Sequence, residues 1–80
     1  MKVRVLISPK KEILDPEGNA VRNSLTQLGF AVSDVRVGRI VDLKLDVPEE
    51  HNAQNVTKEM CEKLLANPLI ESYTIEVKSE

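Results

Sequence analysis

The sequence predicts an α+β fold in which the elements follow in the order strand, helix, strand, strand, helix, strand. Three observations predict it. Apolar residues alternate with polar ones near both ends of the chain, two stretches carry apolar residues at helical spacing, and the stretch between them alternates again. This order suggests a ferredoxin-like layout, with two helices on one face of an antiparallel sheet. No linker or repeat interrupts the 80 residues, so we expect one domain over residues 1–80.

The first and last elements are expected to be strands. Apolar and polar side chains alternate over Lys2–Ser8, and only Leu6 breaks the period of two. A strand with one buried face has this period. Residues 73–78 alternate in the same way, so they form the closing strand. The side chains expected to face the core are those of Val3, Val5, Ile7, Tyr73, Ile75 and Val77.

The first helix has a start signal in Asp15-Pro16-Glu17. The Asp15 carboxylate can accept hydrogen bonds from the free amides of the first turn, and Pro16 has its φ already set for the first helical position. Glu17 places negative charge at the positive end of the helix dipole. Gly29 ends the helix, because a residue without a Cβ adopts the left-handed conformation readily. Apolar residues lie between these limits at spacings of four and three: Val21, Leu25 and Leu28.

A second helix is expected over Ala53–Ala66. Its charged residues fall largely on one face, and Asn67-Pro68 ends it, because Asn tolerates the left-handed position and Pro disfavours a helical residue before it. The apolar face carries Val56, Met60, Cys61, Leu64 and Leu65.

The middle segment, residues 35–47, has two possible organisations. A two-residue turn at Gly38-Arg39 would place Val35 on the same face as Asp42 and Lys44, which mixes apolar and charged residues. A three-residue hairpin connection avoids this, and so does one long strand bent at Gly38. Both remain open. In either case one face carries Val35, Val37, Val41, Leu43, Leu45 and Val47.

Composition restricts the partners and the location. The net charge is −2 and the only aromatic residues are Phe30 and Tyr73, so neither a basic stripe nor a stacking surface for nucleic acid is expected. No apolar run has the length of a membrane span, and the single cysteine, Cys61, cannot form an internal disulfide. We therefore expect a cytoplasmic protein. A domain of this size buries only about 60% of its unfolded surface, so we also expect a homo-oligomer, a dimer or larger.

Few residues suggest chemistry. His51 lies in a charged loop with Glu49, but nothing nearby orients it, so a solvated loop is the favoured interpretation. Cys61 falls on the apolar side of a helix, which favours an inert core residue over a nucleophile. The Lys10-Lys11 pair is either a contact for an acidic partner or, as favoured, a solvated loop. The residues alone therefore predict no catalytic, cofactor-binding or metal-binding site.

Three stretches resemble one family. They are Leu-Asp-Pro-Glu-Gly-Asn-Ala-Val at 14–21, Asp-Val-Arg-Val-Gly-Arg at 34–39 and Met-Cys-Glu-Lys-Leu-Leu-Ala-Asn-Pro-Leu-Ile-Glu at 60–71. In this order and spacing they resemble PurS, the small subunit of phosphoribosylformylglycinamidine synthase, nearly from end to end. The sequence departs from the family at Arg39, where lysine is common, and over Pro48–Asn55, which has no clear match.

The resemblance implies a part in de novo purine synthesis. The enzyme uses ATP and glutamine to convert formylglycinamide ribonucleotide to formylglycinamidine ribonucleotide. It implies that this chain is not the catalyst and binds no cofactor. A large synthetase subunit performs the amidation, a glutaminase subunit releases ammonia, and dimers of the small subunit join the two and help ammonia pass. Whether the homo-oligomer is a dimer or a tetramer, and whether nucleotide controls assembly, stays open.

Two other classes of function remain as alternatives. One is a ferredoxin-like regulatory module that binds a small effector, and the other is a free-standing enzyme that uses Glu49, His51 or Cys61. For partner contacts we select residues around the start of the first helix and around the glycine of the middle segment. Gly18 is included because a glycine inside a helix costs stability unless a backbone or partner approaches closely. The interface candidates are Lys10, Asp15, Gly18, Arg36, Gly38 and Arg39.

Overall fold

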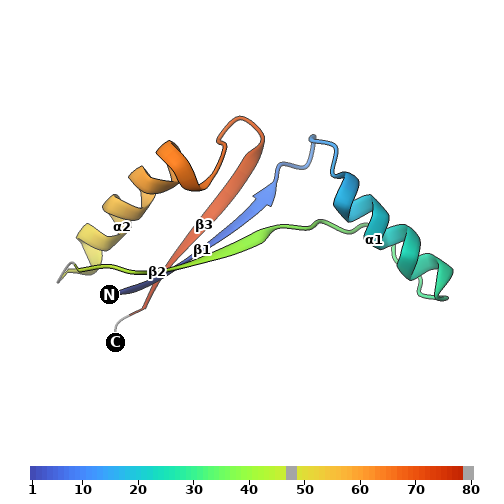
Figure 1. Cartoon of the computed structure of the whole chain (residues 1–80), viewed down its shortest axis with the longest axis horizontal. Coiled ribbons are helices and arrows are strands. Elements are labelled where there is room, and N and C mark those ends of the chain that lie inside the picture. The colour runs from blue at the N-terminus through green and yellow to red at the C-terminus, as the bar shows by residue number, and fades with distance from the viewer. Residues whose placement is uncertain (47–48, 79–80) are drawn as a thin grey trace.

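The computed structural model describes residues 1–46 and 49–78, and at 50 and 51 it describes the backbone only. It confirms the α+β class and shows a three-stranded antiparallel sheet in the order β2-β1-β3, with β1 in the centre (Figure 1). Both terminal strands and both helices form close to their predicted limits. In chain order the elements are β1 (Lys2–Pro9), α1 (Pro16–Gln27), β2 (Arg39–Lys44), α2 (Glu50–Met60), a π-helical turn η1 (Cys61–Leu65) and β3 (Glu71–Lys78).

The core lies on one face of the sheet. Val3, Val5 and Ile7 of β1 are each at most 2% exposed. The register sets Val5 opposite Val41 of β2 and Ile75 of β3, so the inward residues of three strands meet in one layer. Full burial of an aliphatic side chain stabilises a fold by about 1.5–3 kcal/mol, so this layer is the main source of stability in the sheet.

The helix α2 covers this face of the sheet and continues directly into η1. Ala53, Thr57 and Cys61, spaced four apart, are completely buried against the strands. These small side chains allow the helix to approach the sheet closely. The chain leaves the helix through the π-helical turn, in which the Ala66 amide donates to the Cys61 carbonyl at 3.0 Å.

The middle segment does not form a hairpin. The chain passes Gly38 without reversing its direction, which is the second of the two expected organisations (Figure 1). Pairing with β1 begins only at Arg39, however, so the separate strand predicted before Gly38 is absent and the sheet has three strands among the described residues. Val41 and Leu43 face the core as expected, whereas Val47 lies outside the described residues.

The arrangement of the first helix differs from the prediction. Only α2 packs on the sheet, whereas α1 extends beyond the end of the strands (Figure 1). We call residues 10–38, which contain α1 and its two connections, the arm, and the sheet with α2 and η1 the body. The arm accounts for the elongated dimensions of 49 × 27 × 14 Å. No helix in residues 1–46 and 49–78 is long and apolar enough to cross a membrane.

Candidate functional site

The two connections of the arm, residues 10–15 and 28–38, meet the body at its end, and we call this region the junction. It contains most of the interface candidates. Asp15 caps α1 as predicted: its Oδ1 accepts from the Gly18 amide at 3.0 Å. Its Oδ2 accepts from the Val37 amide, also at 3.0 Å, on the returning segment. The Gly18 amide first, and then the Val37 amide, hold the pKa of Asp15 below its ordinary value of 3.8. One ionised carboxylate therefore caps the helix and holds the two connections of the arm together.

Arg36 closes the junction from the other side. Its guanidinium donates to the carbonyls of Lys10, Lys11 and Ile13, the last at 2.9 Å. These three carbonyls belong to the connection between β1 and α1, where the Lys10 carbonyl also accepts from the Ile13 amide at 3.0 Å. The fork of N–H groups on arginine suits this task, which the single ammonium of lysine would perform less well.

Two glycines allow the backbones to come together at the junction. A Cβ on Gly18 would overlap the Val35 carbonyl oxygen, and one on Gly38 would overlap the Ile7 carbonyl oxygen. The close approach anticipated at Gly18 is thus an approach by the chain's own backbone. The same explanation holds for Gly38, beside which the first core strand ends.

Arg39 is paired within the chain. Its guanidinium donates to Glu71 at 2.6 Å and to the Leu65 carbonyl at 2.6 Å, while the other Glu71 oxygen accepts from the Asn67 amide. Arg39, and then the Asn67 amide, lower the pKa of Glu71. These contacts fasten β2 to the end of η1 and to the start of β3, so Arg39, an interface candidate, is paired with a carboxylate of its own chain.

The residues considered for catalysis are not brought together by the described part of the fold. Cys61 is fully buried in the core, and burial raises the pKa of its thiol. The side chain of His51 lies outside the described residues, so the hypothesis of a Glu49-His51 site is not addressed by the structure. The described residues contain no group of three His, Cys, Asp or Glu side chains that could hold a metal ion.

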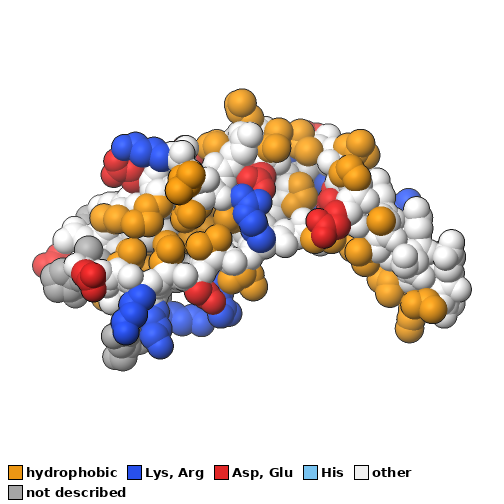
Figure 2. All heavy atoms as spheres, in the orientation of Figure 1, with side chains coloured by type: hydrophobic (Ala, Val, Ile, Leu, Met, Phe, Trp, Pro, Cys, Tyr) orange, Lys and Arg blue, Asp and Glu red, His pale blue; other side chains and the backbone are white. Residues whose placement is uncertain are grey.

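The arm exposes apolar side chains, a feature that the sequence reasoning did not anticipate. Leu14, just before α1, is 75% exposed, and Leu28 and Phe30, just after it, are 73% and 59% exposed; Val21 within α1 is exposed as well, and Figure 2 shows hydrophobic side chains over this part of the molecule. A helix that packed on the sheet would bury such residues. The available signal was the small number of large apolar residues in α1, Val21 and Leu25, which is too few for a second core-forming helix.

The geometry defines a class of protein. It has a three-stranded body with its own core, and an arm that exposes Leu14, Leu28 and Phe30 among the described residues. Exposed apolar side chains of this kind are expected of a small subunit of a larger assembly. The sequence profile of one family, described as "PurS: Phosphoribosylformylglycinamidine (FGAM) synthase", matches residues 2–79. The chain belongs to the PurS family of FGAM synthase subunits.

Individual relatives agree with this assignment. The PurS subunit of the synthase from Bacillus subtilis is 42% identical over 78 residues, which are 96% of this chain and 92% of that protein. The crystal structure of Methanocaldococcus jannaschii PurS, a subunit of an amidotransferase of purine biosynthesis, is similar with a TM-score of 0.88. It is 38% identical, over 99% of this chain and 96% of that one. A chain in the structure of PurLQS from Thermotoga maritima is 26% identical with a TM-score of 0.86, over 94% of this chain and 93% of that one.

Proposed function

We propose that the chain is the non-catalytic small subunit of FGAM synthase, and that it joins the glutaminase subunit to the large synthetase subunit and assists the transfer of ammonia. The observation that carries this proposal is the arm, which leaves Leu14, Leu28 and Phe30 exposed in the described part of the chain. The relative from Thermotoga maritima supports it, because its structure is one of PurLQS. In this proposal ATP and glutamine are consumed on the other subunits, and the complex works in the cytoplasm.

Homo-oligomerisation is part of the proposal. A compact domain of 80 residues has a radius of gyration of about 12 Å, whereas that of this chain is 15.8 Å. A monomer of 9.0 kDa exposes about 4,900 Å² of surface, whereas this chain exposes 5871 Å². An excess of this size, with apolar side chains along the arm, favours burial of the arm in a dimer or larger oligomer.

A reconstitution experiment tests the function. The large subunit and the glutaminase, prepared without this chain, should show little glutamine-dependent formation of formylglycinamidine ribonucleotide, and addition of the chain should restore it. The chain alone should neither hydrolyse ATP nor release ammonia from glutamine, since both reactions need groups for phosphoryl transfer or nucleophilic attack. Ammonia release by the pure chain, or full glutamine-dependent turnover in its absence, would contradict the proposal.

A further inference from the structure

The core face of the sheet is incompletely covered. Among residues 1–46 and 49–78, α2 with its continuation η1 is the only helix that packs on this face, and it lies beside β3 rather than β2. A helix with its side chains is about 10 Å wide, which is less than three strands spaced about 4.8 Å apart require. Val41 and Leu43 of β2 are therefore only half-buried, whereas Val5 and Val3, opposite them on β1, are at most 2% exposed.

An apolar concavity of about 510 Å³ lies between α2 and β2, and we call it the groove. Figure 2 shows hydrophobic side chains on this part of the surface. Leu64 of η1 is 83% exposed there. The two charged residues of the lining, Glu59 and Lys63, pair with each other at 2.7 Å, so the groove needs no charged ligand. Its apolar lining consists of Leu43, Val56, Met60, Leu64 and Leu65.

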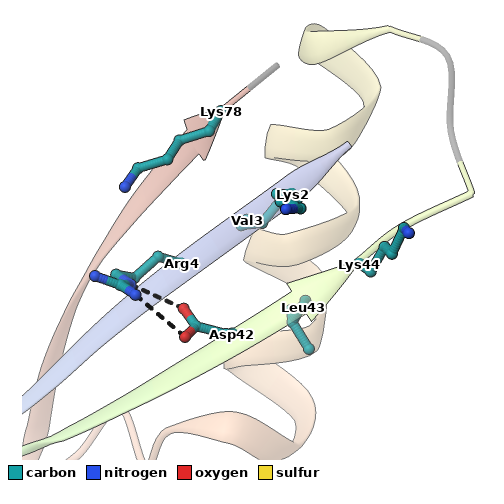
Figure 3. Close-up of a pocket in the computed structure, with 7 residues that line it drawn as sticks. All are labelled: Lys2, Val3, Arg4, Asp42, Leu43, Lys44 and Lys78. Atoms are coloured by element: carbon teal, nitrogen blue, oxygen red, sulfur yellow. Dashed lines mark hydrogen bonds and ion pairs between the residues drawn. The ribbon is translucent and has the colours of Figure 1, made fainter. Parts of the chain in front are cut away.

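The other face of the sheet is more polar. Arg4 and Asp42 form an ion pair across it at 2.8 Å, and three lysines lie on the same face beside them (Figure 3). Closer to the junction this face carries Leu6 and Ile40, which are opposite one another in the register and 36% and 57% exposed. The groove therefore offers more apolar side chains to a partner than this face does.

The helix α1 has the shape and the apolar side that the groove requires. Val21, Leu25 and Leu28 are spaced four and three apart, so they share one side of the helix. Val21 is 38% exposed and Leu28 73%. α1 has 12 residues and is about 18 Å long. The groove follows α2 and η1 from Val56 to Leu65, a length of about 14 Å, so α1 is long enough to fill it.

The arm does not reach the groove of its own chain. The Asp15 carboxylate accepts from the Val37 amide and the Arg36 guanidinium donates to the Ile13 carbonyl, and these bonds hold α1 beyond the end of the strands (Figure 1). An α1 that fills the groove must therefore come from another molecule. Exchange of an identical element between two copies is a low-cost route to a dimer.

The surface area of the chain agrees with a second copy as the occupant. Its 5871 Å² exceed the surface of a compact monomer of this mass by roughly 1,000 Å². A stable interface of standard size buries about 800 Å² on each partner. The excess is thus of the size that one dimer interface removes from each chain.

We propose that the groove receives α1 of a second copy of this chain, and that two copies exchange their arms reciprocally. Leu25 and Leu28 of one copy then pack against Met60 and Leu64 of the other. The exchange completes the layer of two helices on one face of the sheet that the sequence predicts. The inference rests on the homo-oligomer of the proposed function and names its contact surface.

Isotope-filtered nuclear Overhauser measurements on the full chain test the contact. In an equal mixture of carbon-13-labelled and unlabelled chains, we expect contacts between copies that join the methyl groups of Leu25 or Leu28 to those of Met60 or Leu64. Contacts between copies that reach only Ile40 on the other face would overturn the exchange and leave the homo-oligomer of the proposed function standing. A chain that stays monomeric at millimolar concentration would contradict both, while the reconstituted turnover would still test the function by itself.

Two variants with matched exposure decide which face is used. Leu64→Ser should weaken dimerisation on the order of tenfold, because a leucine side chain is no longer buried against α1. The control, Ile40→Ser, removes an exposed apolar side chain from the opposite face and should change the dimer dissociation constant by less than about twofold. Sedimentation equilibrium measures both constants, and circular dichroism confirms that both variants fold. Equal losses in the two variants, or no loss in Leu64→Ser, would overturn the proposal.

Discussion

The body and the arm are stabilised by different interactions. In the body, side chains such as Val5 and Ile7 are almost fully buried between the strands and α2. In the arm, Asp15 and Arg36 hold the chain by hydrogen bonds to backbone groups, while Leu28 remains 73% exposed. The body therefore has a core of its own. The arm has a defined shape without a buried core of its own.

This difference bears on the proposal that the arm meets partners. Apolar surface is the main driving force for association. The arm exposes Leu14, Leu28 and Phe30, and the body exposes Leu64 and Leu69, each 83% exposed. The hydrogen bonds of Asp15 and Arg36 set the direction of α1 before any partner binds, which lowers the ordering cost of association. In the proposed function, the arm is a preformed contact surface carried by a body that has its own core.

The largest expected contrast comes from truncating one apolar side chain in each region. Ile7→Ala should destabilise the chain by about 2–5 kcal/mol, because it leaves a cavity in the buried layer. Leu28→Ala should change the unfolding free energy of the monomer by less than about 0.5 kcal/mol, because its side chain is exposed. Urea denaturation at low protein concentration measures both. Similar losses from the two variants would remove the distinction between body and arm.

A smaller effect is expected at the glycine of the junction. Gly18→Ala should cost about 1–3 kcal/mol, because its Cβ overlaps the Val35 carbonyl oxygen and the backbones must separate. This loss should exceed the gain in helix propensity of about 1 kcal/mol. Asn19→Ala, at the next and exposed position of α1, is the matched control and should be neutral or slightly stabilising. If both alanines stabilise the chain, the backbones are not in close contact at Gly18.

The smallest effect concerns pH. The folded pKa of Asp15 lies below its ordinary value of 3.8, so ionised Asp15 contributes stability above that pH. The contribution is lost as pH falls through the lower, folded value. Asp15→Asn should therefore be less stable than the unmodified chain near pH 6, and the difference should shrink as pH approaches 3. Thermal melts across this range measure it, and a difference that is constant with pH would show that Asp15 does not act through its charge.

Much of the body could be predicted from the sequence. The alternation of Val3, Val5 and Ile7 defined the central strand, and the Asp15-Pro16 signal defined the start of α1 to the residue. These features are local, since each depends on the spacing of a few neighbouring residues. The same holds for Gly29, whose φ of 96° ends the helix as expected.

The position of α1 relative to the sheet could not be predicted, because no local sequence pattern indicates against which element a helix packs. The internal roles of the junction residues could not be predicted either. The Arg36 contacts with Lys10 and Ile13 join residues that are 26 and 23 positions apart in the sequence. The interface candidates at Asp15, Gly18 and Arg36 were chosen for unusual chemistry. In this fold that chemistry shapes the arm, whose apolar surface is then available for contacts.

The central claim is that the arm makes the contacts through which this subunit acts. It is tested most directly by glutamine-dependent turnover of the reconstituted synthase with a Leu28→Ser, Phe30→Ser variant in place of the unmodified chain. Both side chains are exposed in the single chain, so the variant should fold with an unchanged circular dichroism spectrum. We expect it to sediment at lower mass than the unmodified chain and to restore little turnover. A folded variant that restores full turnover would contradict the claim.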